Sequence, residues 1–138
     1  MIDMTSEFGQ RVERRLREEQ IIWLVTVDAS GTPQPNPVWF YWDGSTILIY
    51  SQPNVPKIKN MIANPRIALH FNTDVEGGDV VVLTGNARVE PQGPLAHEVE
   101  PYVQKYRESI PGLGMTAEQM GQTYSTAIHV TPTKLRGF

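Results

Sequence analysis

The sequence contains no cysteine, and it has no apolar run approaching the roughly 18 residues that span a bilayer. The absence of thiols excludes disulfides and thiolate metal sites, and it fits a reducing compartment. The first residues, MIDMTSEFGQRVERRLREE, are charged and lack the apolar core of a signal peptide. We therefore expect a cytoplasmic protein that does not cross a membrane.

The chain also lacks a large excess of charge of either sign. Its 138 residues include 12 basic and 15 acidic side chains, for a net charge of -3. This balance argues against nucleic acid as the main partner, and any anion site must be a local cluster. The length suits one hydrophobic core, so we expect a single domain over residues 1–138.

Familiar catalytic motifs are missing as well. The sequence contains no G-x-G-x-x-G, no P-loop, no G-x-S-x-G and no H-E-x-x-H. His70, His97 and His129 stand apart from one another, and the two in apolar segments, His70 and His129, are typical of hydrogen-bonded structural histidines. We find no nucleophile–base pair and no metal-ligand spacing, so we assign no catalytic or metal-binding residue. Such a chain fits a protein whose cofactor carries the chemistry.

The stretch Tyr50–Arg66, YSQPNVPKIKNMIANPR, combines features of an anion site. Asn54 is a good N-cap, and Pro56 suits the first turn of a helix because its missing N–H has no partner to lose there. Lys57 lies in the same turn, among unpaired N–H groups at the positive end of the helix dipole. These features predict a phosphate site, although an ordinary surface helix with a solvated lysine has the same residue types.

The same helix is predicted to have two faces. Helical spacing groups the apolar residues Val55, Ile58, Met61 and Ile62 on one side. The opposite side carries Lys57, Asn60 and Asn64. One face can therefore pack on a core while the other presents a cation and two amides.

The remaining pattern predicts a mainly β protein. Six segments read as strands: 21–27, 32–42, 46–51, 67–71, 80–89 and 126–130. The prolines at the start of the second segment predict an edge strand or a bulge, and Gly85 predicts a bulge or a close backbone approach in the fifth. Helices are expected near 5–20 and within 91–124, so the fold class is α+β. Closing six strands into a barrel would remove two costly edges.

Four consecutive aromatic residues end the second strand segment, at positions 39–42. Alternation along a strand places two rings inside and two outside. The outer rings could stack on a planar ligand or contact another subunit, while all four could equally fill a small core.

The order of these motifs resembles the pyridoxamine 5′-phosphate oxidase-like split β-barrel superfamily, whose members bind FMN or F420. The shared features are a D-x-x-G turn, a Pro-rich strand ending P-V-W-F, a D-G hairpin, a strand ending in Ser, and K-x-x-N-M-x-x-N-P-R. The chain is similar in particular to the actinobacterial branch of F420-dependent reductases. The match covers residues 8–90 and, more loosely, 128–138.

The resemblance implies a homodimer of six-stranded antiparallel split barrels, with the cofactor at the subunit interface. The ring would lie against the strand formed by Asn36, Pro37, Val38 and Trp39. The phosphate would be held by Ser51, Gln52 and Lys57, with Asn60 nearby.

Two departures from the family pattern bear on the cofactor. Oxidases of pyridoxamine phosphate carry Arg directly before the phosphate-binding Lys, where this chain has Pro56, and they end in an Arg- and His-containing segment that KLRGF lacks. Losing a bidentate phosphate clamp should weaken FMN binding, and we do not expect oxidation of vitamin B6. The resemblance therefore favours an F420H2-dependent reductase of an electron-poor organic acceptor. The alternatives are an FMN-binding oxidoreductase or flavin reductase, and a non-catalytic F420 carrier; haem breakdown is disfavoured by the isolated histidines.

Overall fold

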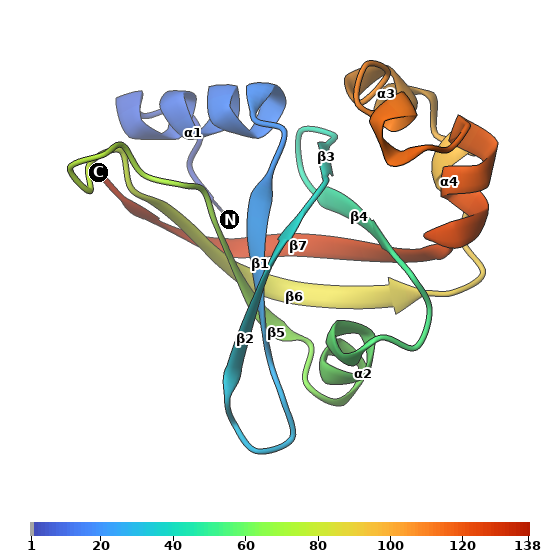
Figure 1. The fold of residues 1–138 in the computed structure, drawn as a ribbon. Coiled ribbons are helices and arrows are strands. Elements are labelled where there is room, and N and C mark those ends of the chain that lie inside the picture. Colours follow the sequence, from blue (N-terminus) through green and yellow to red (C-terminus); the bar gives the residue numbers. More distant parts are fainter. Residues whose placement is uncertain (1) are drawn as a thin grey trace.

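The computed structural model describes residues 2–138 and contains one seven-stranded antiparallel sheet with helices at its rim (Figure 1). The strands lie in the order β2-β1-β5-β6-β7-β4-β3. Figure 1 shows β1, β2 and β5 crossing the direction of β6 and β7, so the sheet is strongly curled. The bounds are α1 Glu7–Glu18, β1 Ile22–Val27, β2 Pro33–Val38, β3 Tyr41–Trp42, β4 Ile47–Ser51, α2 Pro56–Ala63, β5 Arg66–His70, β6 Val81–Glu90, η1 Ala96–Glu98, α3 Glu100–Lys105, η2 Ile110–Leu113, α4 Ala117–Thr123 and β7 Thr126–Gly137.

The α+β class is confirmed, but the prediction of six strands is wrong. The segment expected as one strand over 32–42 is divided into β2, which pairs with β1, and β3, which pairs with β4. The chain changes partner at Trp39 and Phe40, between the two strands. Because β2 and β3 are the two edges of the sheet within residues 2–138, this short link spans the split in the barrel.

The hydroxyl of Tyr106 bridges this split. The register of β1 and β2 pairs Ile22 with Val38, and continuing it by two residues would place Gln20 opposite Phe40. The Tyr106 hydroxyl lies between them instead: it accepts a hydrogen bond from the Phe40 N–H at 2.7 Å and donates to the Gln20 carbonyl at 2.7 Å. A side chain from the end of α3 thus replaces the next pair of the ladder.

The last strand is longer than the sequence indicates. We predicted that it ends at Val130, before Pro132, whereas β7 continues to Gly137 beside β6. Pro132 lies opposite Gly85, where the register of the two strands shifts. Thr133 is the extra residue, so the bulge lies in β7 and not in the strand of Gly85, and it lets Pro132, which has no N–H, remain in a paired strand. The close backbone approach that Gly85 predicts is confirmed, because a Cβ at this position would clash with the Thr131 carbonyl oxygen.

Two apolar clusters fill the protein. The larger lies between the curled sheet, α1 and α2. The smaller joins Tyr50 and Ala127 of the sheet to residues of the 96–120 segment, including Tyr102, Tyr106 and Met120. The helical segment between β6 and β7 is thus attached to the sheet by its own core.

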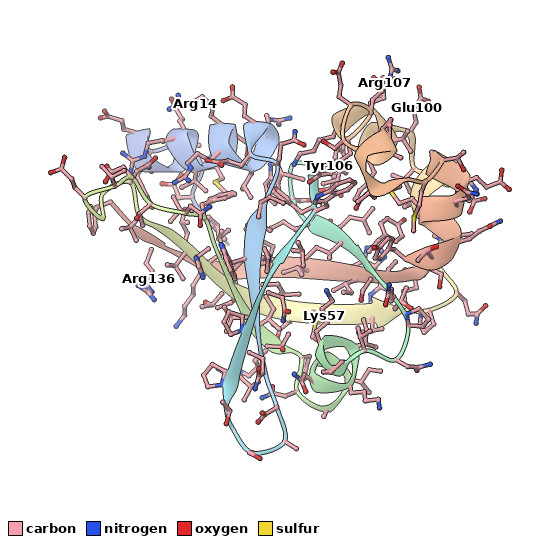
Figure 2. The ribbon with its side chains drawn as sticks, viewed as in Figure 1. Arg14, Lys57, Glu100, Tyr106, Arg107 and Arg136 are labelled. Carbon is pink, nitrogen blue, oxygen red and sulfur yellow. The ribbon has the colours of Figure 1, made fainter. Side chains whose placement is uncertain are left out.

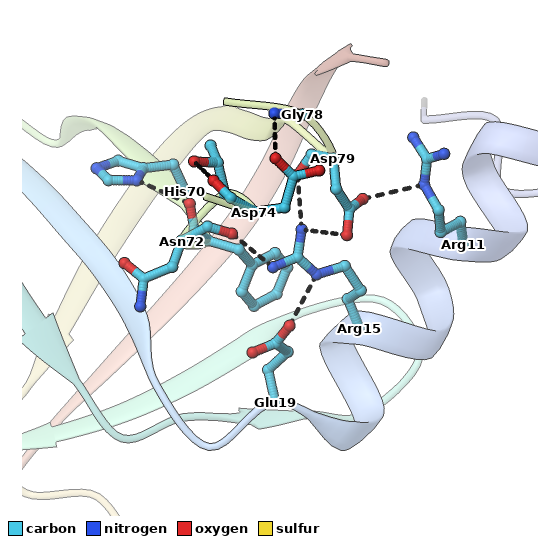
Figure 3. Close-up of polar contacts among 10 residues, drawn as sticks. Arg11, Arg15, Glu19, His70, Asn72, Asp74, Gly78 and Asp79 are labelled. Carbon is cyan, nitrogen blue, oxygen red and sulfur yellow. Dashed lines mark hydrogen bonds and ion pairs between the residues drawn. The ribbon is translucent and has the colours of Figure 1, made fainter. Parts of the chain in front are cut away.

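Arg15 fastens the loop between β5 and β6 to α1 (Figure 3). Its guanidinium donates to the carbonyls of Asp79 and Asn72 at 2.9 and 2.8 Å, and it pairs with Glu19 at 2.8 Å. The side chain is only 11% exposed, and the guanidinium lies 4.7 Å from the centre of the Phe71 ring. On α1 the pairs Arg15–Glu19 and Arg17–Glu13 have i,i+4 spacing, and the mostly buried Arg15 side chain also connects the helix to the loop.

Candidate functional site

A cavity of about 530 Å³ lies beside the edge strand β2. Its walls come from β2, the end of β4, the start of α2 and the helical segment before β7 (Figure 1). The lining residues are Gln34, Asn36, Pro37, Val38, Trp39, Tyr50, Ser51, Gln52, Val55, Pro56, Lys57, Asn60, Ala96, Tyr102, Leu113, Met120 and Tyr124. This volume is within the range of small-molecule and cofactor sites.

All eight residues that the sequence assigns to a cofactor line this one cavity. Asn36, Pro37, Val38 and Trp39 come from β2 and the link after it, and Ser51, Gln52, Lys57 and Asn60 come from β4, the following loop and α2. The structure therefore brings together two groups that are separated along the chain. Their role in binding a cofactor remains a prediction.

The start of α2 differs in detail from the prediction. Asn54 is not the N-cap; it has φ 63° and turns the chain, while Val55 occupies the cap position and supplies no side-chain hydrogen bond. Asn tolerates the left-handed conformation better than most residues, which accounts for this placement. Pro56 begins the helix as expected. Pro56 has no N–H, and the N–H groups of Ile58 and Lys59 donate to the Val55 carbonyl at 3.0 and 3.3 Å, so within residues 2–138 the Lys57 N–H is the donor of this turn without a partner.

Lys57 is a cation without a charged partner. Among residues 2–138 it takes part in no salt bridge, and it lines the cavity while being partly buried. Burial lowers the pKa of its ammonium group below the usual value. The Lys57 side chain extends from α2 toward the sheet (Figure 2). An anion in the cavity would offset the desolvation of its ammonium group. The ammonium and the helix start together fit a phosphate.

The two-faced helix is confirmed only in part. Ile58 and Met61 are buried, but Ile62 is 67% exposed because an eight-residue helix buries a narrow stripe. On the other face, Asn60 lines the cavity and donates to the buried Thr26 hydroxyl at 3.0 Å. That bond fixes the amide and leaves its oxygen free for a ligand. Asn64 instead ends the helix and accepts from the Arg66 N–H at 3.2 Å.

The prolines of β2 determine what its edge offers. They occupy alternate positions 33, 35 and 37, so their nitrogen atoms all lie on one side of the strand. A prolyl nitrogen cannot donate to β1, and that side is therefore the outer edge, as the sequence predicted. The outer edge presents carbonyl acceptors without competing donors. It suits a planar ligand that carries ring N–H groups.

The aromatic run divides as alternation predicts. Phe40 and Trp42 are buried in the larger core, whereas Trp39 and Tyr41 are partly exposed and pack on the smaller one. Trp39 lines the cavity and stacks on Tyr106, with ring centres 4.3 Å apart and planes within 2°. One face of the indole is thus covered by the protein. Trp39 is a rigid part of the cavity wall.

Sequence reasoning missed the far wall of the cavity. Tyr102, Leu113, Met120 and Tyr124 come from the segment 96–124 and make this end mostly apolar and aromatic. The sequence shows an apolar helical stripe there, but it does not show which strand the stripe covers. Gln34 was also missed, although it shares the face of Asn36 two residues later on the same strand.

The three histidines lie away from the cavity. His129 is 2.6 Å from Glu90, and His70 contacts the Phe71 carbonyl at 3.2 Å, as expected for structural histidines. His97 lies in η1 beside Gly121. Within residues 2–138, none of them lines the cavity.

A curled antiparallel sheet with rim helices and a cavity at its proline-rich edge defines the class of split β-barrels. The family model described as pyridoxamine 5′-phosphate oxidase matches residues 8–138, and the chain belongs to this family. Comparison with curated protein sequences finds no match.

Several solved structures share the fold. An F420 reductase is 24% identical, with a TM-score of 0.71 over 90% of this chain and 94% of that chain. A putative pyridoxamine 5′-phosphate oxidase from Listeria innocua is 18% identical, with a TM-score of 0.69 over 92% and 94%. The haem storage protein HutZ from Vibrio cholerae is 14% identical, with a TM-score of 0.66 over 96% and 95%. These neighbours have different functions, so the likeness establishes the fold and leaves the ligand to the residues of the site.

Proposed function

We propose that the protein is an F420H2-dependent oxidoreductase that reduces an electron-poor small organic acceptor. The observation that carries this proposal is the unpaired Lys57 ammonium at the start of α2, in a cavity that also contains the β2 edge. When bound, reduced F420 supplies a hydride from C5 of its deazaflavin ring. Lys57, Ser51 and Gln52 would hold the phosphate, and the strand from Asn36 to Trp39 would lie along the ring.

The protein's own contribution is orientation and exclusion of water. The Trp39 indole is held by Tyr106, and Asn60 is held by Thr26, so both walls are fixed before a ligand enters. Fixed walls lower the entropy cost of holding two reactants together. No acid–base side chain has to act on the cofactor in this scheme.

The residue before Lys57 favours F420 over FMN. Pro56 occupies the first position of α2, and it supplies neither a guanidinium nor an N–H to a phosphate. The Lys57 ammonium makes a point contact with a phosphate. The terminal phosphate of FMN is doubly charged and is held best by a bidentate clamp. FMN remains the second candidate, as an oxidoreductase or flavin reductase of the same fold.

We also propose that two copies form a dimer around the cofactor. Leu113 lines the cavity and is 41% exposed, and Ile62, on the other face of α2, is 67% exposed, so both offer apolar surface to a second copy. A second copy would bury them and close the cavity. Light scattering coupled to size exclusion should give twice the 15.5 kDa chain mass; a monomer at all concentrations would contradict the dimer.

Parallel titrations with F420 and FMN test the cofactor assignment. We expect a purified protein without flavin absorbance that changes the fluorescence of F420 and binds it more tightly than FMN. Reoxidation of F420H2 with a panel of enones and quinones then tests turnover. Tight F420 binding without turnover would indicate a carrier, and preferential FMN binding would indicate the second candidate.

A further inference from the structure

Tyr102 places a hydroxyl group without a partner in the cavity wall. The residue is 3% exposed and lines the cavity, and within residues 2–138 its hydroxyl takes part in no hydrogen bond. Within residues 2–138, the side-chain polar atoms that are sealed from solvent and make no hydrogen bond belong to Arg11, Asp79 and His97, and the Tyr102 oxygen is not among them. The hydroxyl of this buried residue therefore reaches solvent through the cavity. Water can satisfy this hydroxyl while the cavity is empty, but a ligand that displaces the water has to supply an acceptor in its place, so this group points to a ligand with an acceptor oxygen.

The other buried tyrosines of this region use their hydroxyls inside the protein. Tyr50 donates to the Pro94 carbonyl at 2.7 Å, and Tyr106 donates to the Gln20 carbonyl at 2.7 Å. Both rings pack on Tyr102, with centres 5.2 Å from its own, and so hold it in place. Tyr124 also lines the cavity, but it is partly exposed and can be solvated. Tyr102 is thus the rigidly held tyrosine whose hydroxyl donates to no acceptor within residues 2–138.

We propose that the Tyr102 hydroxyl donates a hydrogen bond to a carbonyl oxygen of the acceptor, and that the acceptor is a planar conjugated carbonyl compound, an enone or a quinone. The role in reduction rests on the proposed function, whereas the binding contact does not. Tyr102 would thus be a substrate-binding residue that the sequence does not reveal.

The surroundings of Tyr102 favour a neutral oxygen over a carboxylate. Ala96, Leu113 and Met120 accompany it at this end, and Lys57 is the one cation among the described lining residues, at the start of α2. Burial also raises the pKa of Tyr102, so the hydroxyl keeps its proton and acts as a donor. An apolar, aromatic pocket with one donor fits a conjugated ring that carries a carbonyl group.

The same contact would assist reduction of an enone. The hydride adds to the β carbon, and the electron pair of the C=C bond moves through the carbonyl carbon to the oxygen. Tyr102 stabilises the charge that develops on that oxygen, and one proton from solvent completes the saturated product. The balance is one hydride from F420H2 and one proton per acceptor.

The test is binding of menadione, a naphthoquinone, to the full chain without added cofactor, measured by quenching of tryptophan fluorescence. Trp39 lines the cavity and reports on binding, whereas Trp23 and Trp42 do not line it and contribute background. The absence of cysteine removes the usual site of quinone addition. We expect Tyr102→Phe to weaken menadione binding about three- to tenfold, the effect of one neutral hydrogen bond. Tyr41→Phe, the same chemical change at a residue that does not line the cavity, should change it by less than about twofold.

A matched ligand separates the hydrogen bond from packing. 2-Methylnaphthalene has the same rings without carbonyls, and it should bind wild type and Tyr102→Phe equally. Because no partner is lost, the midpoint of thermal unfolding of Tyr102→Phe should not fall. The proposal would be overturned if Tyr102→Phe lost the same affinity for both ligands, or if it bound menadione as tightly as wild type does. It would also be overturned if wild type did not bind menadione.

Titrating the same variants with F420 separates this inference from the proposed function. F420 affinity should be unchanged in Tyr102→Phe. If F420 binds neither wild type nor the variants, while menadione binds wild type more tightly than Tyr102→Phe, the proposed function fails and the carbonyl contact stands. If Tyr102→Phe weakens F420 instead of menadione, the hydroxyl serves the cofactor and the inference is wrong.

Discussion

Replacing Tyr106 with Phe removes one oxygen atom from the point where the sheet divides. The residue is fully buried beneath α3 (Figure 2), and its hydroxyl accepts from the Phe40 N–H while donating to the Gln20 carbonyl. The hydroxyl also lies 3.0 Å from the Phe40 carbonyl, but that carbonyl keeps another donor, because the Lys105 ammonium lies 2.8 Å from it. The ring keeps its stack on Trp39, so the contacts that matter for stability are those with the Phe40 N–H and the Gln20 carbonyl.

The expected loss of stability follows from these two contacts. The donated hydrogen bond contributes about 0.5–1.5 kcal/mol, and the Phe40 N–H left without an acceptor in the core costs about 1–3 kcal/mol. We therefore expect the free energy of unfolding to fall by about 2–4 kcal/mol. With an unfolding entropy of about 2.1 cal/mol/K per residue over 138 residues, a loss near 3 kcal/mol lowers the midpoint by about 10 °C.

Urea unfolding followed by circular dichroism measures this quantity directly. The control is Tyr41→Phe, because within residues 2–138 the Tyr41 hydroxyl makes no hydrogen bond and the residue is partly exposed; its effect should stay within about 0.5 kcal/mol. If Tyr106→Phe is as stable as Tyr41→Phe, the hydroxyl does not bridge the split. The free energy of unfolding should fall with urea concentration at the same slope in wild type and in both variants, which would show that the same two-state unfolding is compared.

Three further predictions concern Lys57, Lys105 and Gly85. Lys57→Ala should weaken F420 binding, measured by fluorescence, about 10- to 150-fold, because a charge-assisted contact is lost. Lys59 is exposed on the same helix, and Lys59→Ala should leave F420 binding unchanged. Equal effects of the two substitutions would place the phosphate elsewhere. Burial lowers the pKa of Lys105 to about 8, below its value of 10.5 in the unfolded chain, so the unfolded chain binds more protons between these values. The free energy of unfolding of wild type should therefore rise from about pH 8 to about pH 10 relative to Lys105→Met, and parallel pH profiles in urea would contradict the shift. Gly85→Ala places a Cβ against the Thr131 carbonyl and should cost about 1–3 kcal/mol in urea unfolding, whereas Gly112→Ala, which enters open space, should cost little; similar stabilities would argue against the close approach at the bulge.

The sequence by itself determined the local elements of this fold. Alternating and helical apolar patterns gave the strands and helices, the prolines at 33, 35 and 37 placed β2 at an edge, and Gly85 marked a close backbone approach. These features depend on properties of single residues, such as the missing prolyl N–H and the missing Cβ. Short-range rules can therefore predict them. Such rules fail where a residue on the adjacent strand determines whether a strand continues. Pro132 is an example, because it continues a strand where Gly85 lies opposite it.

The division of the expected second strand was decided only by tertiary structure. The run 32–42 has strand-forming residues throughout, and nothing local marks Trp39 and Phe40 as the point where pairing changes from β1 to β4. The change depends on the curl of the whole sheet and on Tyr106, which is 66 residues away along the chain from Phe40. A contact of such separation leaves no periodic trace in the sequence.

The candidate site divides in the same way. A local pattern, a lysine at a helix start, predicts Lys57, and the resemblance to split barrels supplies the other seven residues; the structure brings all eight to one cavity. The apolar end, with Tyr102 and Met120, exists only because the segment 96–124 folds back over β4 and β7 through its own small core. Local chemistry thus fixed which residues can hold an anion. Packing between distant segments decided what can lie beside it.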